Sequence, residues 1–195
     1  MEKFYFEKLS IKRKKDAIDY ILEFYKYNSN INGSGGLDKY LDNYENWLLL
    51  LEDYKNPISS SSFVPARTYF LVRKSDDKIV GMTNIRLSLN DRLRKSGGHI
   101  GYSIRPVERK KGYNKINLYL GLLICKKYGI ENALLTCDKE NIASKKTMEA
   151  LGGKFIKEEI EEDSVELFYT FDVDDVIINY KDIYDDKIIT RIKKL

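Results

Sequence analysis

Hydrophobic positions recur along the chain with two different periods, and each change of period marks the boundary of a predicted element. Residues 3–11 have the composition of a strand, and residues 12–27 place apolar side chains at helical spacing. The polar, glycine-rich stretch 28–36 predicts a loop. A stripe of apolar residues over 37–51 predicts one continuous helix. The chain therefore opens as strand, helix, loop and helix.

The central part of the sequence predicts a hairpin and then a strand followed by a helix. Two apolar runs, 67–74 and 79–89, flank a short turn and are typical of a β-hairpin. After a polar loop, residues 97–106 predict a strand that ends at Pro106, because proline cannot donate to a central ladder. Helical spacing then runs from residue 112 to 129, where a glycine is suited to the C-terminal cap.

The last third predicts a second strand and helix, a closing hairpin and a terminal helix. Residues 132–137 form a buried-strand run, and a short helix is expected over 141–151. The segments 154–160 and 164–171 flank an acidic turn and predict a hairpin. Residues 174–195 place apolar side chains near one helical face. The order of elements is that of an α+β protein.

Composition restricts the class of protein further. With 195 residues and 43% hydrophobic content, the chain can bury one sizeable core, and its length favours one domain. A net charge of +4 says little about nucleic acid unless the charge is localised. The two cysteines, Cys125 and Cys137, and the lack of an N-terminal apolar segment predict a soluble cytoplasmic protein with reduced thiols, away from the membrane.

Positive charge is concentrated in "RPVERKKGYN", residues 105–114, directly before a predicted helix. The first N–H groups of a helix have no internal partner, and the helix dipole adds partial positive charge there. Gly112 allows the backbone to approach a bulky anion, and Arg109, Lys110 and Lys111 can contact phosphate oxygens. The loop lacks the glycine patterns of triphosphate and dinucleotide sites. It predicts a pyrophosphate site of another kind.

The loop resembles the signature of the GNAT (GCN5-related N-acetyltransferase) superfamily, R/Q-x-x-G-x-G/A, which stands here as Arg109 to Asn114 with Asn114 in place of the final glycine or alanine. "GGHIGYSIRP" resembles the fourth strand of that family, and "LLTCDKENIASKKTMEALGGKF" its fifth strand and following helix. The likeness is closest to uncharacterised bacterial acetyltransferases that carry "GGHIGYSxRPxERxKGY". It covers residues 1 to about 172 and is strongest over 97–155.

The resemblance implies a fold and a division of the chain. The fold is a central mixed, mostly antiparallel sheet, splayed between strands 4 and 5 and flanked by helices. The acetyltransferase domain would span residues 1–172. The resemblance leaves residues 173–195 unexplained. Their apolar spacing predicts a helical C-terminal extension that packs either on the domain or on a partner subunit, in a possible homodimer.

The resemblance also implies a co-substrate and its binding residues. Acetyl-CoA would lie in the splayed opening, no metal would be used, and the acetyl group would pass directly to a primary amine of a small molecule or a protein. The positions that match the family's cofactor-binding residues are the backbone of Ser103, Ile104 and Arg105, the loop residues Arg109, Lys110, Lys111, Gly112, Tyr113 and Asn114, and Asn141.

The catalytic residues are less well defined. His99 is the only histidine and is a candidate general base, or else a structural imidazole bonded to nearby backbone; many relatives use a water instead. Relatives often place the acid tyrosine where Met148 stands here, so Tyr169, Tyr102 and Tyr113 are candidate substitutes. Cys137 suggests an acyl-cysteine intermediate, although a buried cysteine commonly serves as a small apolar residue.

Two other functions stay open at this point. The Asn114 and Met148 departures suggest a catalytically silent acyl-CoA-binding or regulatory module. The basic clusters at 12–15 and 105–111 suggest nucleic-acid binding, but they lack interleaved aromatic residues, so no nucleic-acid partner is predicted. Arg86 could bind an acidic substrate group or pair with a carboxylate of the chain itself. Acceptor specificity is expected from residues 28–66 and 90–96.

Overall fold

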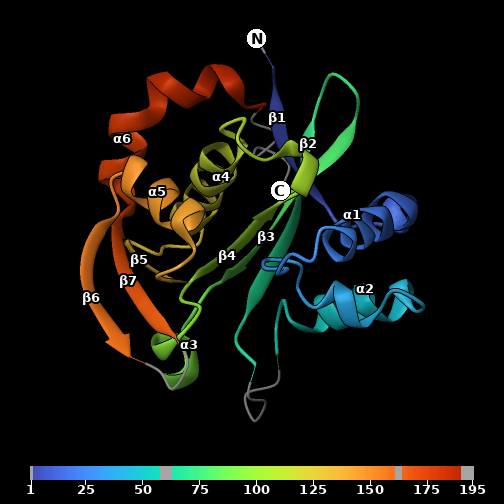
Figure 1. Ribbon diagram of the computed structural model, residues 1–195, viewed down its shortest axis with the longest axis horizontal. Helices are drawn as coiled ribbons and strands as arrows, with labels where there is room; N and C mark the ends of the chain where they lie inside the picture. The colour runs from blue at the N-terminus through green and yellow to red at the C-terminus, as the bar shows by residue number, and fades with distance from the viewer. Residues whose placement is uncertain (1, 58–62, 161–163, 190–195) are drawn as a thin grey trace.

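The computed structural model describes residues 2–57, 63–160 and 164–189, and the structural statements below concern these residues. Two antiparallel sheets form the centre of the molecule (Figure 1). The first has the order β1 (Phe4–Lys8), β2 (Ala66–Arg73), β3 (Lys78–Arg86), β4 (Ile100–Ile104), and the second the order β5 (Asn132–Asp138), β7 (Val165–Asp172), β6 (Lys154–Ile160). The helices are α1 (Lys14–Lys26), α2 (Tyr44–Asp53), α3 (Asp91–Lys95), α4 (Tyr113–Lys127), α5 (Ile142–Ala150) and α6 (Val173–Tyr184). The predicted α+β architecture of antiparallel sheets flanked by helices is confirmed.

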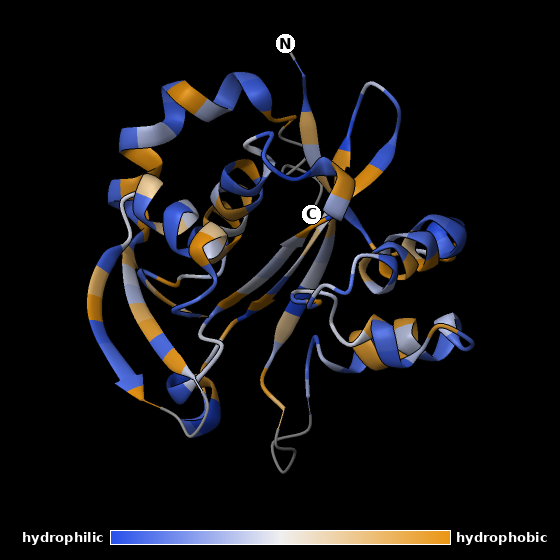
Figure 2. Cartoon of the chain, in the orientation of Figure 1, coloured by the Kyte–Doolittle hydropathy of each residue, from blue (hydrophilic) through white to orange (hydrophobic). Residues whose placement is uncertain are grey.

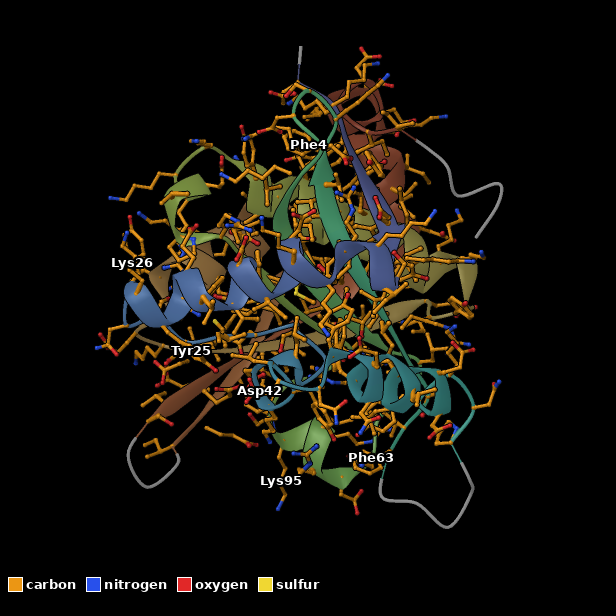
Figure 3. All side chains as sticks on the ribbon, turned by 90° about the vertical axis from the view of Figure 1, so that its right-hand side faces the viewer. Phe4, Tyr25, Lys26, Asp42, Phe63 and Lys95 are labelled. Carbon is orange, nitrogen blue, oxygen red and sulfur yellow. The ribbon has the colours of Figure 1, made fainter. Side chains whose placement is uncertain are left out.

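One face of the first sheet is covered by α1 and α2, which lie side by side in Figure 3. Helix α1 buries Ala17, Tyr20, Ile21 and Phe24, at the i, i+3, i+4 and i+7 spacing of a single helical face. Figure 2 shows these apolar positions separated by hydrophilic ones along the helix. They pack in a core with Phe70 and other residues of the sheet. Burial of this stripe is what holds the helix on the strands.

The other face is covered by α4, which lies between the two sheets (Figure 1). Its sequence is apolar on most sides, and it buries residues all around its circumference, as a helix in the middle of a core does. Asn117 is fully buried in this helix, and its Oδ1 accepts a hydrogen bond from Thr83 Oγ1 at 2.5 Å. This polar contact ties α4 to β3.

The structure corrects two of the predicted elements near the sheet. The helix expected over 37–51 is a 3-10 turn at Leu37–Lys39 and then α2, because the Asn43 side chain accepts from the Asn46 N–H and caps a new helix start. The loop expected before β4 contains the short helix α3, capped in the same way by Asn90.

The C-terminal helix is shorter than predicted. Helix α6 ends at Tyr184, and Ile188 instead forms a parallel bridge with Phe4 of β1. Val173, Val176 and Tyr184 are buried in the same core as α4. Helix α6 therefore packs on the chain's own core, and the end of the predicted helix, 190–195, lies outside the described residues.

The two sheets meet where β4 begins beside β5. The His99 N–H donates to Leu134 O at 2.7 Å, and the Leu134 N–H donates to His99 Nδ1 at 2.9 Å. Gly98 makes this approach possible: its φ is +56°, and a Cβ there would lie 2.3 Å from Leu134 O. Beyond this junction β4 and β5 belong to different sheets and separate. The imidazole is thus bonded to neighbouring backbone, the structural role that the sequence left open.

We predict that His99→Ala lowers the free energy of unfolding by about 1–3 kcal/mol, because the Leu134 N–H loses its acceptor. His99→Asn, whose side-chain oxygen can replace Nδ1, should recover most of that loss. Burial lowers the pKa of His99 below its ordinary value of 6.5, so the contribution is present above pH 6.5 and is lost as the pH falls below it. Urea unfolding of the three proteins between pH 5 and 8 measures this. Equal stabilities of the Ala and Asn variants would contradict it.

Candidate active site

A cavity of about 1070 Å³ occupies the opening between β4 and β5. Its walls come from β4, the start of α4, the end of β5, the start of α5 and the loop after α1. The loop enters because Ser103 Oγ donates to Asn32 O. All the predicted cofactor residues except Arg105 and Lys111 line this cavity. Segments that are far apart in the sequence therefore form one continuous wall.

The register of β4 decides which of its backbone groups face the cavity. The Arg86 N–H donates to His99 O, and the Arg105 N–H donates to Val80 O at 2.9 Å. In an antiparallel ladder this directs the odd-numbered residues of β4 toward β3 and the even-numbered ones toward the opposite edge. Of the three predicted backbone contacts, Ile104 lies on that edge, whereas Ser103 and Arg105 face β3. Sequence reasoning missed the backbone of Ile100 and Tyr102, which lie on the same edge, because register cannot be read before strand pairing is known.

Gly112 is placed at the N-terminus of α4, as the motif predicts. Its φ is +80°, and a Cβ built there would meet nothing within 4 Å. Lys110 also has a left-handed φ, +62°, so the chain turns tightly in front of the helix. The unpaired N–H groups of the first turn of α4 open toward the cavity side of this turn. This is a suitable cradle for a phosphate.

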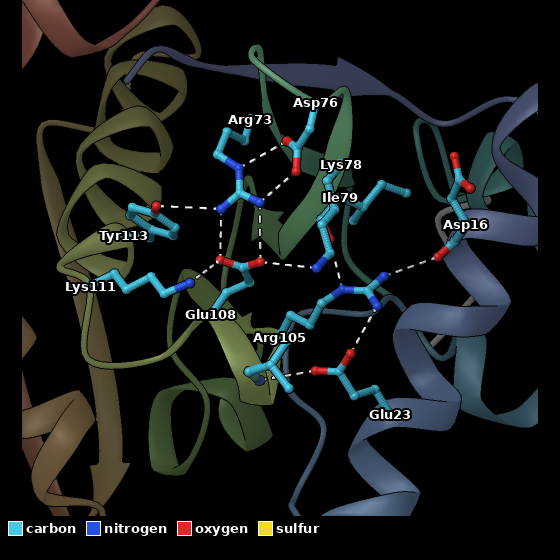
Figure 4. A network of polar contacts seen from close by, with 11 residues as sticks. Asp16, Glu23, Arg73, Asp76, Lys78, Ile79, Arg105, Glu108, Lys111 and Tyr113 are labelled. Atoms are coloured by element: carbon cyan, nitrogen blue, oxygen red, sulfur yellow. Dashed lines mark hydrogen bonds and ion pairs between the residues drawn. The ribbon is translucent and has the colours of Figure 1, made fainter. Parts of the chain in front are cut away.

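Glu108 organises the loop from inside (Figure 4). The residue is 3% exposed, and its carboxylate binds Arg73 at 2.7 Å, Lys111 at 2.8 Å and Lys78 at 3.0 Å. Burial alone would raise the pKa of Glu108, but the hydrogen bonds from Arg73, Lys111 and Lys78 outweigh it and lower the pKa to about 2. The prediction that Lys111 contacts pyrophosphate is not met by its position, because its ammonium is directed to this buried carboxylate.

Arg105 also stabilises the loop and is not among the residues that line the cavity (Figure 4). Its guanidinium is buried, donates to Ile79 O at 2.9 Å and pairs with Glu23 at 3.0 Å. Glu23 in turn accepts from the Val107 N–H at 3.0 Å. Arg109 is exposed and lines the cavity, with its guanidinium 2.7 Å from Ser29 Oγ. Arg105 and Lys111 thus stabilise the conformation of the loop. Arg109, Lys110 and two further lysines line the cavity.

Those two lysines were not predicted. Lys115 lies in the first turn of α4, and Lys146 lies on α5. Lys115 stands one residue beyond the motif, so its position was a usable signal. Lys146 comes from a helix that only the tertiary fold brings to this end of the cavity, and no pattern in the sequence indicates it.

Asn114, the departure from the family motif, ties α4 to α5. Its Nδ2 donates to Thr147 Oγ1 at 3.2 Å, and that hydroxyl donates its own hydrogen to Ala143 O at 2.8 Å. The amide is therefore oriented with Oδ1 turned away from Thr147, and Oδ1 is buried without a hydrogen-bond partner among the described residues. An unpaired acceptor in the wall and an open glycine cradle both fit a phosphate-containing ligand that also carries amide N–H donors, as CoA does.

Asn141, the last predicted cofactor residue, caps α5. Its Oδ1 accepts from the Ser144 N–H at 3.1 Å, and the residue also lines the cavity. The two roles coexist, as the sequence suggested. Ser144 itself meets Tyr102 across the opening, with 2.8 Å between the two hydroxyl oxygens. Burial raises the pKa of Tyr102, so its hydroxyl stays protonated at neutral pH.

The other candidate catalytic groups lie differently. Tyr169 is 1% exposed, and its hydroxyl donates to Glu149 Oε1 of α5 at 3.1 Å. Neither Tyr169 nor His99 is among the residues that line the cavity. Tyr113 lines it, but its hydroxyl accepts from Arg73 at 3.4 Å. Burial, with Glu166 nearby, raises the pKa of Cys137 to about 11, so the thiol is protonated and a poor nucleophile.

The fold and the cavity together define an acetyltransferase-like domain: two sheets that part at β4 and β5, with a phosphate cradle at the helix that follows β4. A family profile described as "Acetyltransferase (GNAT) domain" matches residues 13–154. The chain therefore belongs to the GNAT acetyltransferase family. No curated protein matches the chain in sequence.

Solved structures share this fold at low sequence identity. Ribosomal-protein-S5-alanine acetyltransferase from Vibrio fischeri superposes with a TM-score of 0.66 at 16% identity, covering 90% of this chain and 96% of that one. Microcin C7 self immunity acetyltransferase MccE, in complex with acetyl-CoA and AMP, gives 0.60 at 15% identity, covering 87% and 92%. Spermidine/spermine N-acetyltransferase SpeG from Vibrio cholerae gives 0.59 at 14% identity, covering 91% and 98%.

Within the ranges given above, no helix is long and apolar enough to cross a membrane. In the same part of the chain, no three His, Cys, Asp or Glu side chains are grouped so that they could hold a metal ion.

We predict that Glu108→Gln destabilises the protein by about 3 kcal/mol at pH 7, because three cations lose a charged partner. The folded pKa of Glu108, about 2, lies below its ordinary value of 4.5. The contribution is therefore complete above pH 4.5 and is lost as the pH falls toward 2.

Urea unfolding of wild type and variant from pH 7 to pH 2.5 measures this difference. Glu131→Gln, which removes an exposed carboxylate, is the control and should change stability little. A gap between wild type and Glu108→Gln that stays constant over this range would contradict the prediction.

Proposed function

We propose that the protein is an acetyl-CoA-dependent N-acetyltransferase that transfers the acetyl group directly to a primary amine of a small molecule or a protein. The observation that carries the proposal is one cavity that joins the open edge of β4 to the cationic start of α4. A long ligand with a pyrophosphate at one end and amide groups along its arm suits such a cavity.

The residues divide the binding between charge and backbone. Lys110, Lys115 and the first N–H groups of α4 would hold the pyrophosphate. The backbone of Tyr102 and Ile104 would bond the pantetheine arm on the free edge of β4. When bound, acetyl-CoA supplies an activated thioester; the amine nitrogen forms a bond to its carbonyl carbon, and the carbon–sulfur bond breaks.

The chain's own groups handle two protons in this reaction. One must leave the attacking ammonium, and one must reach the departing thiolate. Tyr102 is a protonated hydroxyl in the cavity wall, bonded to Ser144, and we propose it as the donor to sulfur. His99 remains the proposed base, acting through a water, because its Nδ1 is taken by Leu134 and it lies outside the cavity wall. The protonated state of Cys137 favours direct transfer over an acyl-cysteine.

The relatives support this assignment. MccE was solved with acetyl-CoA, and SpeG is a spermidine/spermine N-acetyltransferase. The free thiols of Cys125 and Cys137 are consistent with a reducing, cytoplasmic location. A nucleic-acid partner is disfavoured, because Arg105 and Lys111 are engaged in ion pairs with the chain's own carboxylates.

A catalytically silent acyl-CoA-binding module is the second candidate, and one observation favours it. Met148 is fully buried at the position where relatives often carry the acid tyrosine. In this case the protein would bind acetyl-CoA and turn over no amine.

We predict that Gly112→Glu abolishes acetyl-CoA binding, because a carboxylate at the cradle repels pyrophosphate. Gly129→Glu is the matched control: it is an exposed glycine with φ +75° and open space around it, at the other end of α4. Calorimetric titration should show wild-type affinity for Gly129→Glu and no binding for Gly112→Glu. Equal affinity of the two variants would overturn the proposed cradle.

We predict that Tyr102→Phe lowers kcat by about 100-fold while its affinity for acetyl-CoA stays near that of wild type, because only the hydroxyl is removed. Tyr169→Phe removes the other candidate hydroxyl and should keep kcat within a few-fold. Thiol release with the best amine of a panel measures both variants. The reverse result would assign the acid to Tyr169, and full activity in both would leave thiolate departure without a tyrosine donor.

A further inference from the structure

The end of the cavity farthest from the loop at 109–112 carries an arginine, Arg86, that has no ion-pair partner in the part of the chain that the structure describes. Arg86 is the last residue of β3 and lines the cavity together with Ser96, Gly97 and Gly101. The five residues of β4 separate this end from the cationic loop, about 16 Å at the rise of a strand. Arg86 is therefore placed where the acceptor, rather than the pyrophosphate, would lie.

The contacts of Arg86 leave half of its guanidinium available. Nη1 donates to Gly97 O at 2.9 Å and to Gly98 O at 3.0 Å. Nη2 lies beside Gly101, 3.4 Å from where a side chain would begin, so the missing side chain leaves it room. Among the described residues, Nε and Nη2 make no hydrogen bond and no carboxylate lies within ion-pair distance of Arg86. This is the geometry in which a guanidinium can still form a two-point contact with a planar anion.

The surroundings of Arg86 disfavour its positive charge. Burial lowers the pKa of Arg86, and the charge of Arg92 on α3 acts in the same direction. Arginine nevertheless keeps its proton in proteins. A partly buried cation with only carbonyl partners is unfavourable, and a bound anion relieves this.

Two carboxylates of the other sheet, Glu166 and its register partner Asp138, line the same cavity. Glu166 of β7 lines the cavity, and its Oε1 accepts from Ser96 Oγ at 3.3 Å. Gly97, which carries the carbonyl bonded by Arg86, is itself held by Thr136 Oγ1 at 2.7 Å from its N–H. The segment Ser96–Gly97 thus bonds both Arg86 and Glu166. It fixes the two side chains without bringing them within ion-pair distance of each other.

We propose that the acceptor is an amine that also carries a carboxylate, as an amino acid does, with the carboxylate on Arg86 and the ammonium beside Glu166. The inference rests on the proposed acetyltransferase function and names the substrate class of the same cavity. The anion contact supplies selection, because an uncharged analogue leaves the arginine without a partner.

The test compares each of the twenty protein amino acids with its own α-carboxamide, which has nearly the same shape but lacks the negative charge, at a pH where the free-amine fraction of each compound is known and corrected for. Wild-type kcat/KM, measured by thiol release, should favour the acids over their amides by about 10- to 100-fold, mainly through KM. Arg86→Gln should remove this preference by weakening the acids and leaving the amides unchanged. Arg86→Lys should restore part of it.

Two further readouts separate the explanations. Calorimetry with acetyl-CoA should give the same Kd for wild type and Arg86→Gln. If the wild type does not bind acetyl-CoA, the proposed function itself has failed. Calorimetric titration of wild type and Arg86→Gln with the best-binding amino acid, without acetyl-CoA, then measures what Arg86 contributes to amino-acid affinity in the absence of turnover. Equal values for acids and amides on the wild type overturn the inference, even if the variant does not fold. A uniform loss on both classes in Arg86→Gln would show that Arg86 only holds the Gly97–Gly98 turn.

Discussion

The short contact between Gly98–His99 and Leu134 is the constraint from which the rest of the site follows. It joins two sheets at one point, and beyond it each sheet completes its hydrogen bonding away from the other. The free edge of β4 is therefore left facing a cavity instead of a neighbouring strand. Helix α4 packs between both sheets and keeps them from closing. An open strand edge, which elsewhere is a site for unwanted strand pairing, here forms the wall of a cavity.

The cationic loop shows how a charged sequence can be divided between structure and ligand. Glu108 and Glu23 each take cations that the sequence alone would assign to a phosphate. Their ion pairs hold the backbone in the left-handed turns that position the N–H groups of α4. Much of the side-chain charge of the loop is therefore spent on fixing its backbone conformation.

Much of the fold was predictable, because local periodicity and caps decide helices such as α1 and α4, and because residues 109–114 form a contiguous motif. The succession of strands and helices along the chain and the glycine turn at the start of α4 followed from those patterns. The features that the sequence did not predict depend on contacts between distant residues. The buried carboxylate of Glu108 decides the direction of Lys111, and the register of β4 with β3 decides which backbone groups of β4 face the cavity. Lys146 and the pairing of Tyr102 with Ser144 arise only when α5 is folded across the opening. The break at Asn43 was missed because a polar cap can interrupt an apolar stripe without changing its period.

The two ends of the cavity are held by different kinds of contact. At the cradle, buried ion pairs link the cationic loop after β4 to β2, β3 and α1, so a change there disturbs several elements at once. At the far end, the wall is made by the glycine-rich loop after α1 and by the turn before β4, whose contacts are largely backbone carbonyls and hydroxyls. A substitution at the far end therefore disturbs fewer elements of the fold than a substitution at the cradle, so the two ends of one cavity differ in how much change the fold tolerates.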